Sequence, residues 1–550
     1  MATPYIDHGI APPVPARKSA ADVRADLLAR REIAFLDVRE EAYHAEGHPL
    51  FAANLPFSRL EFEAYARIPQ RNTAIVLLDN GEGLAALAAE RLFALGYQSV
   101  ALLEDGLQGW RNAGYEVFRD VNSPSKAFGE LVEVQRQTPF LSAEEVKALI
   151  DTQADTVIVD ARRFDEFQTM SIPTATSVPG AELVLRVRGL APRPETRVIV
   201  NCAGRTRSII GAQSLINAGL PNPVAALRNG TIGWKLAGQA LDHGQSRRFP
   251  EVDDTIRKTS AAAARRVADR AGVKRVDLGT TIRWIDQGSQ TVYRFDVRAP
   301  EEFVSGHLTG FRNAPGGQLV QETDAFAPVR GARIVLVDDD GTRANMTASW
   351  LAQMAWDVSV IDSDLGEPDG LRARFTERGH GYTPLPALPQ LPDGAAISPS
   401  RLAEWLQPGS DSAAVVFDFA PSSNYAKGHI PGSWFALRSS LVDALNARAA
   451  AGRYVFTSPD GLVARFAWAD ARRFTTKPLH VLDGGTAAWT AQGGPTNDGA
   501  PRYASPPIDR YKRPYEGTDS PAAAMQAYLD WEYGLVEQLN RDGTHGFRVL

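Results

Sequence analysis

Short apolar runs alternate with longer segments of helical periodicity along most of the chain. One such run, Val198-Ile199-Val200, precedes residues 209–218, where apolar side chains recur at the spacing of one helix face. Similar runs precede helical segments at residues 84–95 and 345–354. Short apolar strands that alternate with helices predict α/β domains with mainly parallel sheets.

The strand pattern occurs four times, which indicates an internal repeat. One strand ends in aspartate in each copy, and these aspartates are spaced by 123, 136 and 122 residues: Asp37, Asp160, Asp296 and Asp418. A second strand is followed by a residue at intervals of 123, 136 and 120: Asp79, Cys202, Asp338 and Ser458. Two independent markers therefore keep nearly the same register. We expect the strand-end aspartates to cap a turn or bind a neighbouring arginine rather than to act in catalysis.

A third marker closes the repeated unit. Glycine pairs followed by tryptophan come after a short strand and end at Trp110, Trp234 and Trp489, whereas residues 361–364 of the third copy lack both residue types. We expect these tryptophans to pack in the cores of their units.

The repeat divides the chain into units one to four. The predicted domains are residues 10–125, 135–250, 270–385 and 395–500, and residues 501–550 form a C-terminal extension. The longest interval contains an Ala/Arg-rich helical run at residues 260–271, which predicts a connector between two pairs: unit one with two, and unit three with four. Residues 521–540 predict an amphipathic helix, whose aromatic stripe is expected to pack on the body of the protein or on a second subunit of a homodimer.

Composition and charge narrow the classes of function. The 550 residues are 44% hydrophobic and 23% charged, with a net charge of −6, so a nucleic acid is not an expected partner. Residues 1–20 lack an apolar signal core, and no apolar run approaches the roughly 20 residues of a membrane helix, so no membrane partner is expected. The single cysteine excludes intrachain disulfides and multi-cysteine metal sites, so no metal or cofactor is predicted and a reduced, cytoplasmic location is expected.

The one cysteine, Cys202, stands where a strand meets a helix. Loop amides, the positive end of a helix dipole and two arginines are expected to favour its thiolate over its thiol. A lone cysteine is otherwise most often a small buried hydrophobe, but this loop context is typical of a nucleophile beside an anion. The sequence predicts Cys202 as catalytic. The predicted substrate-binding residues follow it: Ala203, Gly204, Arg205, Thr206, Arg207 and Ser208.

The repeated unit resembles the rhodanese homology domain. The resemblance covers roughly residues 10–500 and is carried by the Asp-Val-Arg strand ends, the Cys loop, the Gly-x-x-Gly-Trp closure and the segment from Gly428 to Ser433, which Gly47-His48 and Gly306-His307 echo. It implies four tandem three-layer domains with mainly parallel sheets. It also implies a thiosulfate sulfurtransferase in which Cys202 takes a sulfur atom from an anionic donor, carries it as a persulfide and delivers it to cyanide or a thiol.

Some residues depart from the family pattern. Gly204 stands two residues after the cysteine where the family often has glycine at three, and residues 170–174 replace the Gly-His-Ile-Pro-Gly segment. These two departures affect which sulfur donor is expected and not the sulfur chemistry. By the same resemblance, Arg207 favours thiosulfate over mercaptopyruvate as the donor. A phosphatase-like loop would place arginine where Ser208 stands, so phosphatase or arsenate reductase chemistry is disfavoured.

The other three units lack the thiol. Asp79, Asp338 and Ser458 cannot form a persulfide, and a carboxylate would repel an anionic donor. Units one, three and four are therefore expected to be inactive, with unit one leaning on the active unit two. The alternative hypothesis is a sulfur acceptor, redox sensor or scaffold that does not turn over a free donor.

Overall fold

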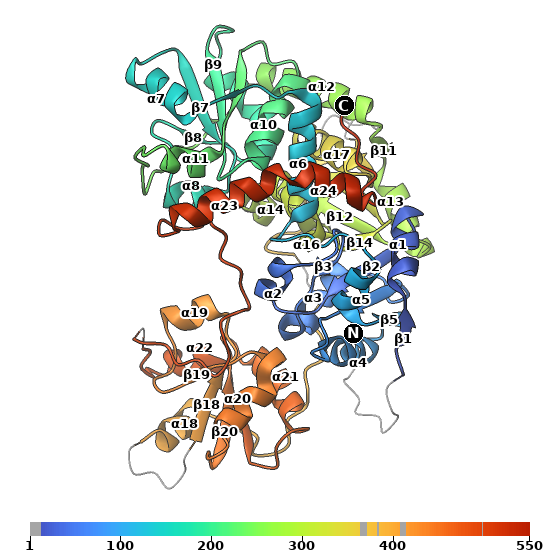
Figure 1. Ribbon diagram of the computed structural model, residues 1–550, viewed down its shortest axis with the longest axis vertical. Helices are drawn as coiled ribbons and strands as arrows, with labels where there is room; N and C mark the ends of the chain where they lie inside the picture. Colours follow the sequence, from blue (N-terminus) through green and yellow to red (C-terminus); the bar gives the residue numbers. More distant parts are fainter. Residues whose placement is uncertain (1–12, 363–370, 382–383, 408–413, 498) are drawn as a thin grey trace.

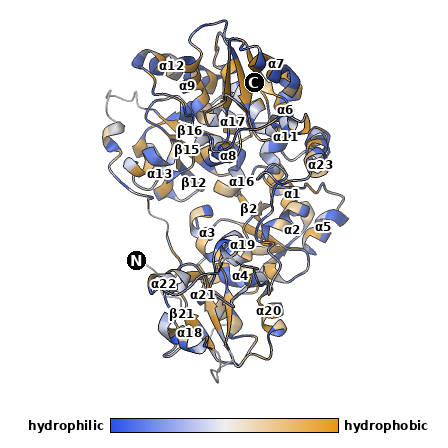
Figure 2. Ribbon diagram, turned by 90° about the vertical axis from the view of Figure 1, so that its left-hand side faces the viewer, coloured by the Kyte–Doolittle hydropathy of each residue, from blue (hydrophilic) through white to orange (hydrophobic). Residues whose placement is uncertain are grey.

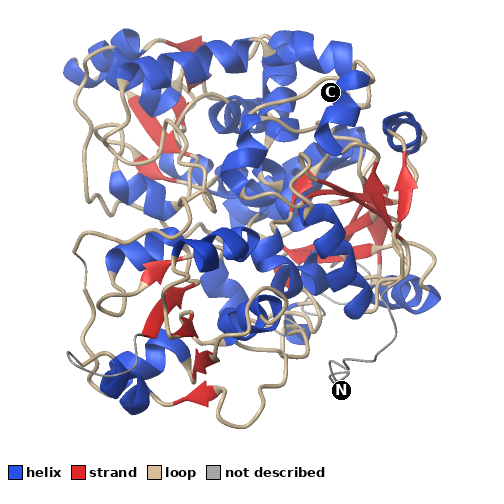
Figure 3. Ribbon diagram, turned by 60° about the horizontal axis from the view of Figure 1, so that its bottom comes forward, coloured by secondary structure: helices blue, strands red, loops and turns tan. Residues whose placement is uncertain are grey.

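The protein was analysed as a computed structural model that describes residues 13–362, 371–381, 384–407, 414–497 and 499–550. Four sheets of mainly parallel strands, each covered by helices, follow one another along the chain (Figure 1), and Figure 3 shows their strands in red among the helices. This confirms the predicted four α/β units. Residues 363 and 364, where the third copy lacks the closing motif, lie outside the described residues.

Unit one contains a six-stranded sheet in the order β1-β5-β4-β2-β14, with β3 paired to β2. Its elements are β1 (Ala16–Lys18), α1 (Ala20–Leu28), β2 (Ile33–Asp37), α2 (Glu41–Glu46), β3 (Ala53–Asn54), the 3-10 helix η1 (Phe57–Arg59), α3 (Leu60–Arg67), β4 (Ile75–Leu78), α4 (Leu84–Ala94), β5 (Val100–Leu103) and α5 (Gly106–Asn112). Helix α6 (Ser123–Arg136) connects it to unit two.

Unit two has five parallel strands in the order β6-β10-β9-β7-β8. Its elements are β6 (Phe140–Leu141), α7 (Ala143–Asp151), β7 (Thr156–Asp160), α8 (Phe164–Thr169), β8 (Thr176–Ser177), η2 (Gly180–Glu182), α9 (Leu183–Leu190), β9 (Arg197–Asn201), α10 (Thr206–Asn217), β10 (Val224–Leu227) and α11 (Gly230–Leu236). The expected Ala/Arg-rich connector is helix α12 (Asp254–Ala271), which packs against α9 and α17.

Unit three has the strand order β11-β16-β15-β12-β13, and its strand β14 joins the sheet of unit one. Its elements are β11 (Lys274–Val276), α13 (Leu278–Gln287), β12 (Val292–Asp296), α14 (Pro300–Ser305), β13 (Arg312–Asn313), α15 (Gly316–Gln321), α16 (Thr323–Phe326), β14 (Val329–Arg330), β15 (Arg333–Val337), α17 (Arg343–Gln353), β16 (Asp357–Ile361) and η3 (Arg372–Arg374).

Unit four has the strand order β17-β21-β20-β18-β19. Its elements are β17 (Ala396–Ile397), α18 (Pro399–Trp405), β18 (Ala414–Asp418), α19 (Ser422–Lys427), β19 (Trp434–Phe435), η4 (Arg438–Ser440), α20 (Leu441–Ala447), β20 (Arg453–Thr457), α21 (Leu462–Ala471), β21 (Leu479–Leu482) and α22 (Gly485–Ala491).

The middle strands are hydrophobic along their length because helices cover both faces of each sheet, and Figure 2 shows this colouring. The closing tryptophans are buried as predicted, with Trp234 at 0% exposure. The strand-end aspartates of units one to three each bind the arginine two residues on, as predicted. In unit two, Arg162 donates to both Asp160 oxygens at 2.9 and 2.7 Å.

The units pair differently from the sequence prediction. The contacts between units are made by short helices that occupy the same place in the repeat: η1 packs against η4, and η2 packs against α15. Unit one therefore pairs with unit four, and unit two pairs with unit three. Arg438 of unit four donates to both carboxylate oxygens of Glu61 in unit one, at 2.7 and 2.9 Å. Arg343 of unit three donates to Glu182 of unit two at 2.8 Å. The predicted pairing of one with two and three with four is therefore wrong, because these contacts lie between segments far apart in the sequence.

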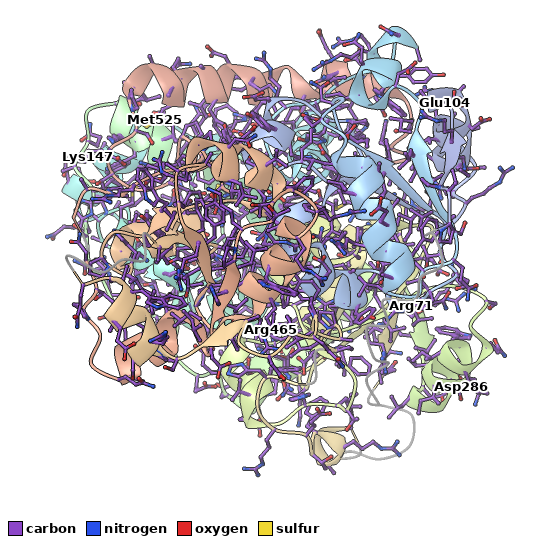
Figure 4. The ribbon with its side chains drawn as sticks, turned by 90° about the horizontal axis from the view of Figure 1, so that it is seen from below. Arg71, Glu104, Lys147, Asp286, Arg465 and Met525 are labelled. Carbon is purple, nitrogen blue, oxygen red and sulfur yellow. The ribbon has the colours of Figure 1, made fainter. Side chains whose placement is uncertain are left out.

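The C-terminal extension docks on its own chain. Helices α23 (Ala522–Tyr533) and α24 (Leu535–Asp542) pack on α6, and α23 also contacts α11 of unit two. Figure 1 shows these two helices in red across α6, and Met525 marks α23 in Figure 4. None of the described helices combines the length and the apolar composition that a bilayer crossing requires.

Candidate active site

Cys202 lies directly after β9, at the carboxyl end of a central strand of unit two, and α10 begins four residues later. The amides of Thr231 and Ile232 in α11 donate to the carbonyls of Cys202 and Ala203 at 2.9 and 3.0 Å. Gly230 has a φ of +53°, and a Cβ there would stand 2.3 Å from the Cys202 carbonyl oxygen. The first glycine of the closing motif is therefore required for α11 to hold the Cys loop.

The same backbone amide faces the residue at the Cys202 position in every unit. In unit one the amide of Ala85 donates to Asp79 at 3.0 Å, and in unit three the amide of Ala344 donates to Asp338 at 2.9 Å. In unit four the amide of Ala464 donates to the Ser458 hydroxyl at 3.3 Å. Each donor lies six residues after its acceptor.

In unit two this donor is the amide of Ser208, which hydrogen-bonds to the Cys202 sulfur and lowers the pKa of the thiol. The loop is therefore a cradle for an electron-rich side-chain atom: oxygen in three units and sulfur in one.

The thiol is enclosed. Cys202 is 1% exposed, and its Sγ donates to Ser208 Oγ at 3.4 Å, which in turn donates to the Arg205 carbonyl at 2.8 Å. Burial raises the pKa of the Cys202 thiol above its ordinary value, and the opposing effects of Arg207 and Ser208 do not cancel this rise. The sequence expectation that the surroundings favour thiolate is wrong for this enclosed state, because desolvation outweighs the cation and the amide.

Arg207 is the predicted cation that acts on the sulfur. It donates to both Glu166 oxygens of α8 at 2.8 and 2.9 Å. Burial alone would raise the pKa of Glu166, but Arg207, together with Arg162 and Arg163, lowers that pKa to about 2. The Arg207 charge also lowers the pKa of Cys202, so this guanidinium stabilises negative charge on the sulfur.

Arg205 points away from the sulfur. It donates to Glu130 of α6 at 2.8 and 2.7 Å, also pairs with Glu133, and stacks 4.1 Å from the ring centre of Tyr533. The two predicted arginines therefore have different roles. Arg207 lowers the pKa of the Cys202 thiol, and Arg205 connects the Cys loop to α6 and α23. Thr206 likewise packs against α6, where a Cβ on Gly129 would meet its methyl group at 2.7 Å.

Two residues of the C-terminal extension cover the Cys loop. A Cβ on Gly204 would stand 3.3 Å from both Tyr528 and Glu532 Oε2, so the glycine permits close approach of α23. Tyr528 donates to Glu532 Oε1 at 2.8 Å, while Oε2 is buried with no hydrogen-bond partner among the described residues. Burial, together with the charge of Glu130, raises the pKa of Glu532 to about 8. Sequence reasoning did not place these residues at the site, and the aromatic stripe of residues 521–540 was the signal that α23 docks.

A polar cavity of about 590 Å³ opens beside Arg207. Units one, two and three and the C-terminal extension line it, with Arg162 and Arg163 from unit two and Arg510 and Arg513 from the extension. Arg207 is among its lining residues and Cys202 is not, so the cavity does not reach the sulfur.

Comparisons with known proteins agree with the repeat. The profile described as "Rhodanese-like domain" matches residues 19–113, 142–237, 281–366 and 398–492. A crystal structure of thiosulfate sulfurtransferase from Pseudomonas aeruginosa is 62% identical, covers 97% of this chain and 100% of its own, and superposes with a TM-score of 0.94.

More distant structures match less of the chain. A structure titled for 3-mercaptopyruvate sulfotransferases, from Escherichia coli, is 19% identical, covers 42% of this chain and 100% of its own, and has a TM-score of 0.22, too low to bear on function. A comparison with curated proteins finds none that matches.

Proposed function

Because the chain belongs to the rhodanese-like family and is a sulfurtransferase, we propose that Cys202 carries sulfur from an anionic sulfane donor such as thiosulfate to a thiophilic acceptor. The acceptor would be cyanide or a thiol. The thiosulfate sulfurtransferase from Pseudomonas aeruginosa, which matches nearly the whole chain, supports this donor.

The proposed cycle has two transfers. The Cys202 thiol first loses its proton, and its sulfur then attacks the outer sulfur of thiosulfate; a new S–S bond forms, the donor S–S bond breaks, and sulfite leaves with the electron pair. The acceptor next attacks the outer sulfur of the persulfide, so that cyanide becomes thiocyanate and the Cys202 thiolate returns. No net oxidant or reductant is consumed.

The observation that carries this proposal is the amide cradle shared by the four units. The Asp79, Asp338 and Ser458 oxygens occupy it in units one, three and four, so it suits an atom that accepts a hydrogen bond. In unit two the atom is sulfur, and the amide and Arg207 stabilise it as the proton leaves. Units one, three and four hold no thiol and are proposed to have no transfer activity.

Arg207 supports an anionic donor. Its side chain lines a 590 Å³ space that can admit a small molecule. A guanidinium has five N–H donors and Arg207 uses two of them on Glu166, so its remaining N–H groups are the proposed anchor of the donor sulfonate.

Thiocyanate formation from thiosulfate and cyanide tests the proposal. Cys202→Ser is expected to lower turnover by about 10³-fold or more, since it removes the nucleophile. Ser458→Ala, at the equivalent position of unit four, is the matched control and should leave turnover unchanged. Turnover that survives Cys202→Ser would overturn the proposal.

Two further outcomes distinguish the alternatives. A persulfide detected by intact mass without turnover would identify a sulfur acceptor that does not process a free donor. Faster turnover with mercaptopyruvate than with thiosulfate would correct the donor and keep Cys202 as the nucleophile.

A further inference from the structure

A second cavity, of about 420 Å³, lies where unit one, unit three and the end of the chain meet. Three arginines line it: Arg30 after α1, Arg330 at the end of β14, and Arg548 in the C-terminal tail. It shares no lining residue with the cavity beside Arg207. It is therefore a separate cavity.

Arg330 lies between two aromatic side chains. Its guanidinium carbon is 4.2 Å from the ring centre of Phe51 and 4.3 Å from that of Trp356. Within the described part of the chain, no carboxylate forms an ion pair with it, whereas Arg162, Arg207 and Arg438 each have one. Burial, aided by the nearby charge of Arg30, lowers the pKa of Arg330 to about 9.

The other two arginines add positive charge without compensation. Among the described residues, neither Arg30 nor Arg548 has a carboxylate within ion-pair distance, and the Arg548 guanidinium donates to the Ala271 carbonyl at 3.4 Å. Lys274 also lines the cavity, but Asp357 pairs with it at 2.7 Å. The cavity thus concentrates three cations in a chain whose net charge is −6.

A buried donor at the same place also lacks a partner. The Trp356 Nε1 group is buried and has no hydrogen-bond acceptor among the described residues. Buried indole N–H groups are normally satisfied, so an unpaired donor on a residue that lines the cavity is unusual.

We propose that this cavity binds a small polyanion through tetrahedral oxyanion groups, such as the phosphate or sulfonate groups of a metabolite. Guanidinium groups match such oxygens through paired N–H donors, and Arg330 is held in place by the two rings. A single oxyanion would leave most of a 420 Å³ space empty, so the ligand is expected to carry two or more such groups. The anion would also offset the repulsion between Arg30 and Arg330.

Titration calorimetry with the full chain at pH 7 and constant ionic strength tests this site. Pyrophosphate and methanedisulfonate are the probes, since each carries two tetrahedral groups of one chemistry. Saturable binding of either probe is expected, and the probe that binds more tightly identifies the phosphate or the sulfonate class.

Substitutions localise the binding. Arg330→Gln and Arg30→Gln should each raise the dissociation constant of the probe by about tenfold or more, because each removes charged hydrogen-bond donors. Arg30 is exposed, so its variant remains informative if Arg330→Gln fails to fold. Arg17→Gln, at an exposed arginine on β1 outside the cavity, is the matched control and should bind as the wild type does.

Two results would overturn the proposal. One is the absence of saturable binding of both probes to the wild-type chain. The other is binding that both cavity variants leave unchanged, which would place the anion elsewhere, including beside Arg207.

Discussion

One neighbouring side chain decides the state of each strand-end aspartate. Asp37, Asp160 and Asp296 are buried and have an arginine two residues on that neutralises them. Unit four has Ala420 at that place, and its amide donates to the Asp418 carboxylate at 2.9 Å. Burial without a counter-ion raises the pKa of Asp418 to about 6.

Asp418→Asn is expected to stabilise unit four in a pH-dependent way. The folded pKa of about 6 lies above the ordinary value of 3.8, so burial penalises the charged form and the cost grows as pH rises through this window. The variant should unfold with a free energy higher than the wild type by up to about 3 kcal/mol above pH 6, and the gain should vanish near pH 4.

Denaturant unfolding between pH 4 and 8 measures this difference. Asp393→Asn, at an exposed position of the same region, is the control and should show no such trend. A gain that is the same at every pH would contradict a titrating Asp418.

At the scale of elements, helix α23 decides the environment of the sulfur. Its apolar residues Met525 and Leu529 are buried against Ile232 of α11, which directs Tyr528 and Glu532 onto the Cys loop. A helix of 12 residues is marginal by itself, so tertiary packing sets its position. Burial under α23 and the charge of Glu532 both raise the pKa of Cys202.

Glu532→Gln is expected to make Cys202 ionise at lower pH. The pKa of Glu532 is about 8, and that of Cys202 is raised above its ordinary value, so the carboxylate is charged where the thiol titrates. Removing the repulsion, of order 1 kcal/mol, should speed iodoacetamide alkylation about fivefold near pH 9.

Intact mass follows this alkylation directly, because the chain has one cysteine. Glu537→Gln, on the exposed face of α24, is the matched control. Coinciding pH profiles for Glu532→Gln and the wild type would show that the carboxylate does not act on the sulfur.

At the scale of the whole molecule, the four units form two pairs through the same short helix of the repeat. Unit three joins the pairs, because its α15 contacts unit two and its β14 extends the sheet of unit one. Unit four is held to unit one by Arg438, which also donates to Asp470 at 3.0 Å. Unit two is therefore supported directly by unit three, α6 and the C-terminal extension.

Arg438→Gln is expected to loosen unit four. The substitution leaves Arg91 as the remaining cation paired with both Glu61 and Asp470. Removing one partner of a buried ion pair lowers the free energy of unfolding by about 3 kcal/mol. A separate early transition in calorimetry and a larger radius of gyration in solution scattering should follow. Arg401→Gln, which removes an exposed pair with Glu404 in the same unit, should change neither measurement.

The sequence by itself determined the repeat and the place of the cysteine. Strand periodicity, the strand-end aspartates and the Gly-x-x-Gly-Trp closure are local patterns. The residues of each pattern lie within a few positions of the element that they specify. Cys202 at the end of a strand, and the arginine bound by each aspartate of units one to three, follow from this local information.

Tertiary structure alone decided which groups surround the sulfur and which units pair. Arg205 turns away because Glu130, 75 residues earlier, holds it, and Cys202 is enclosed because α23 lies over its loop from about 330 residues later. The pKa of a thiol depends on desolvation and on nearby charges, which are properties of the folded neighbourhood. Segments distant in the sequence create that neighbourhood, and no periodicity in the chain encodes their contact.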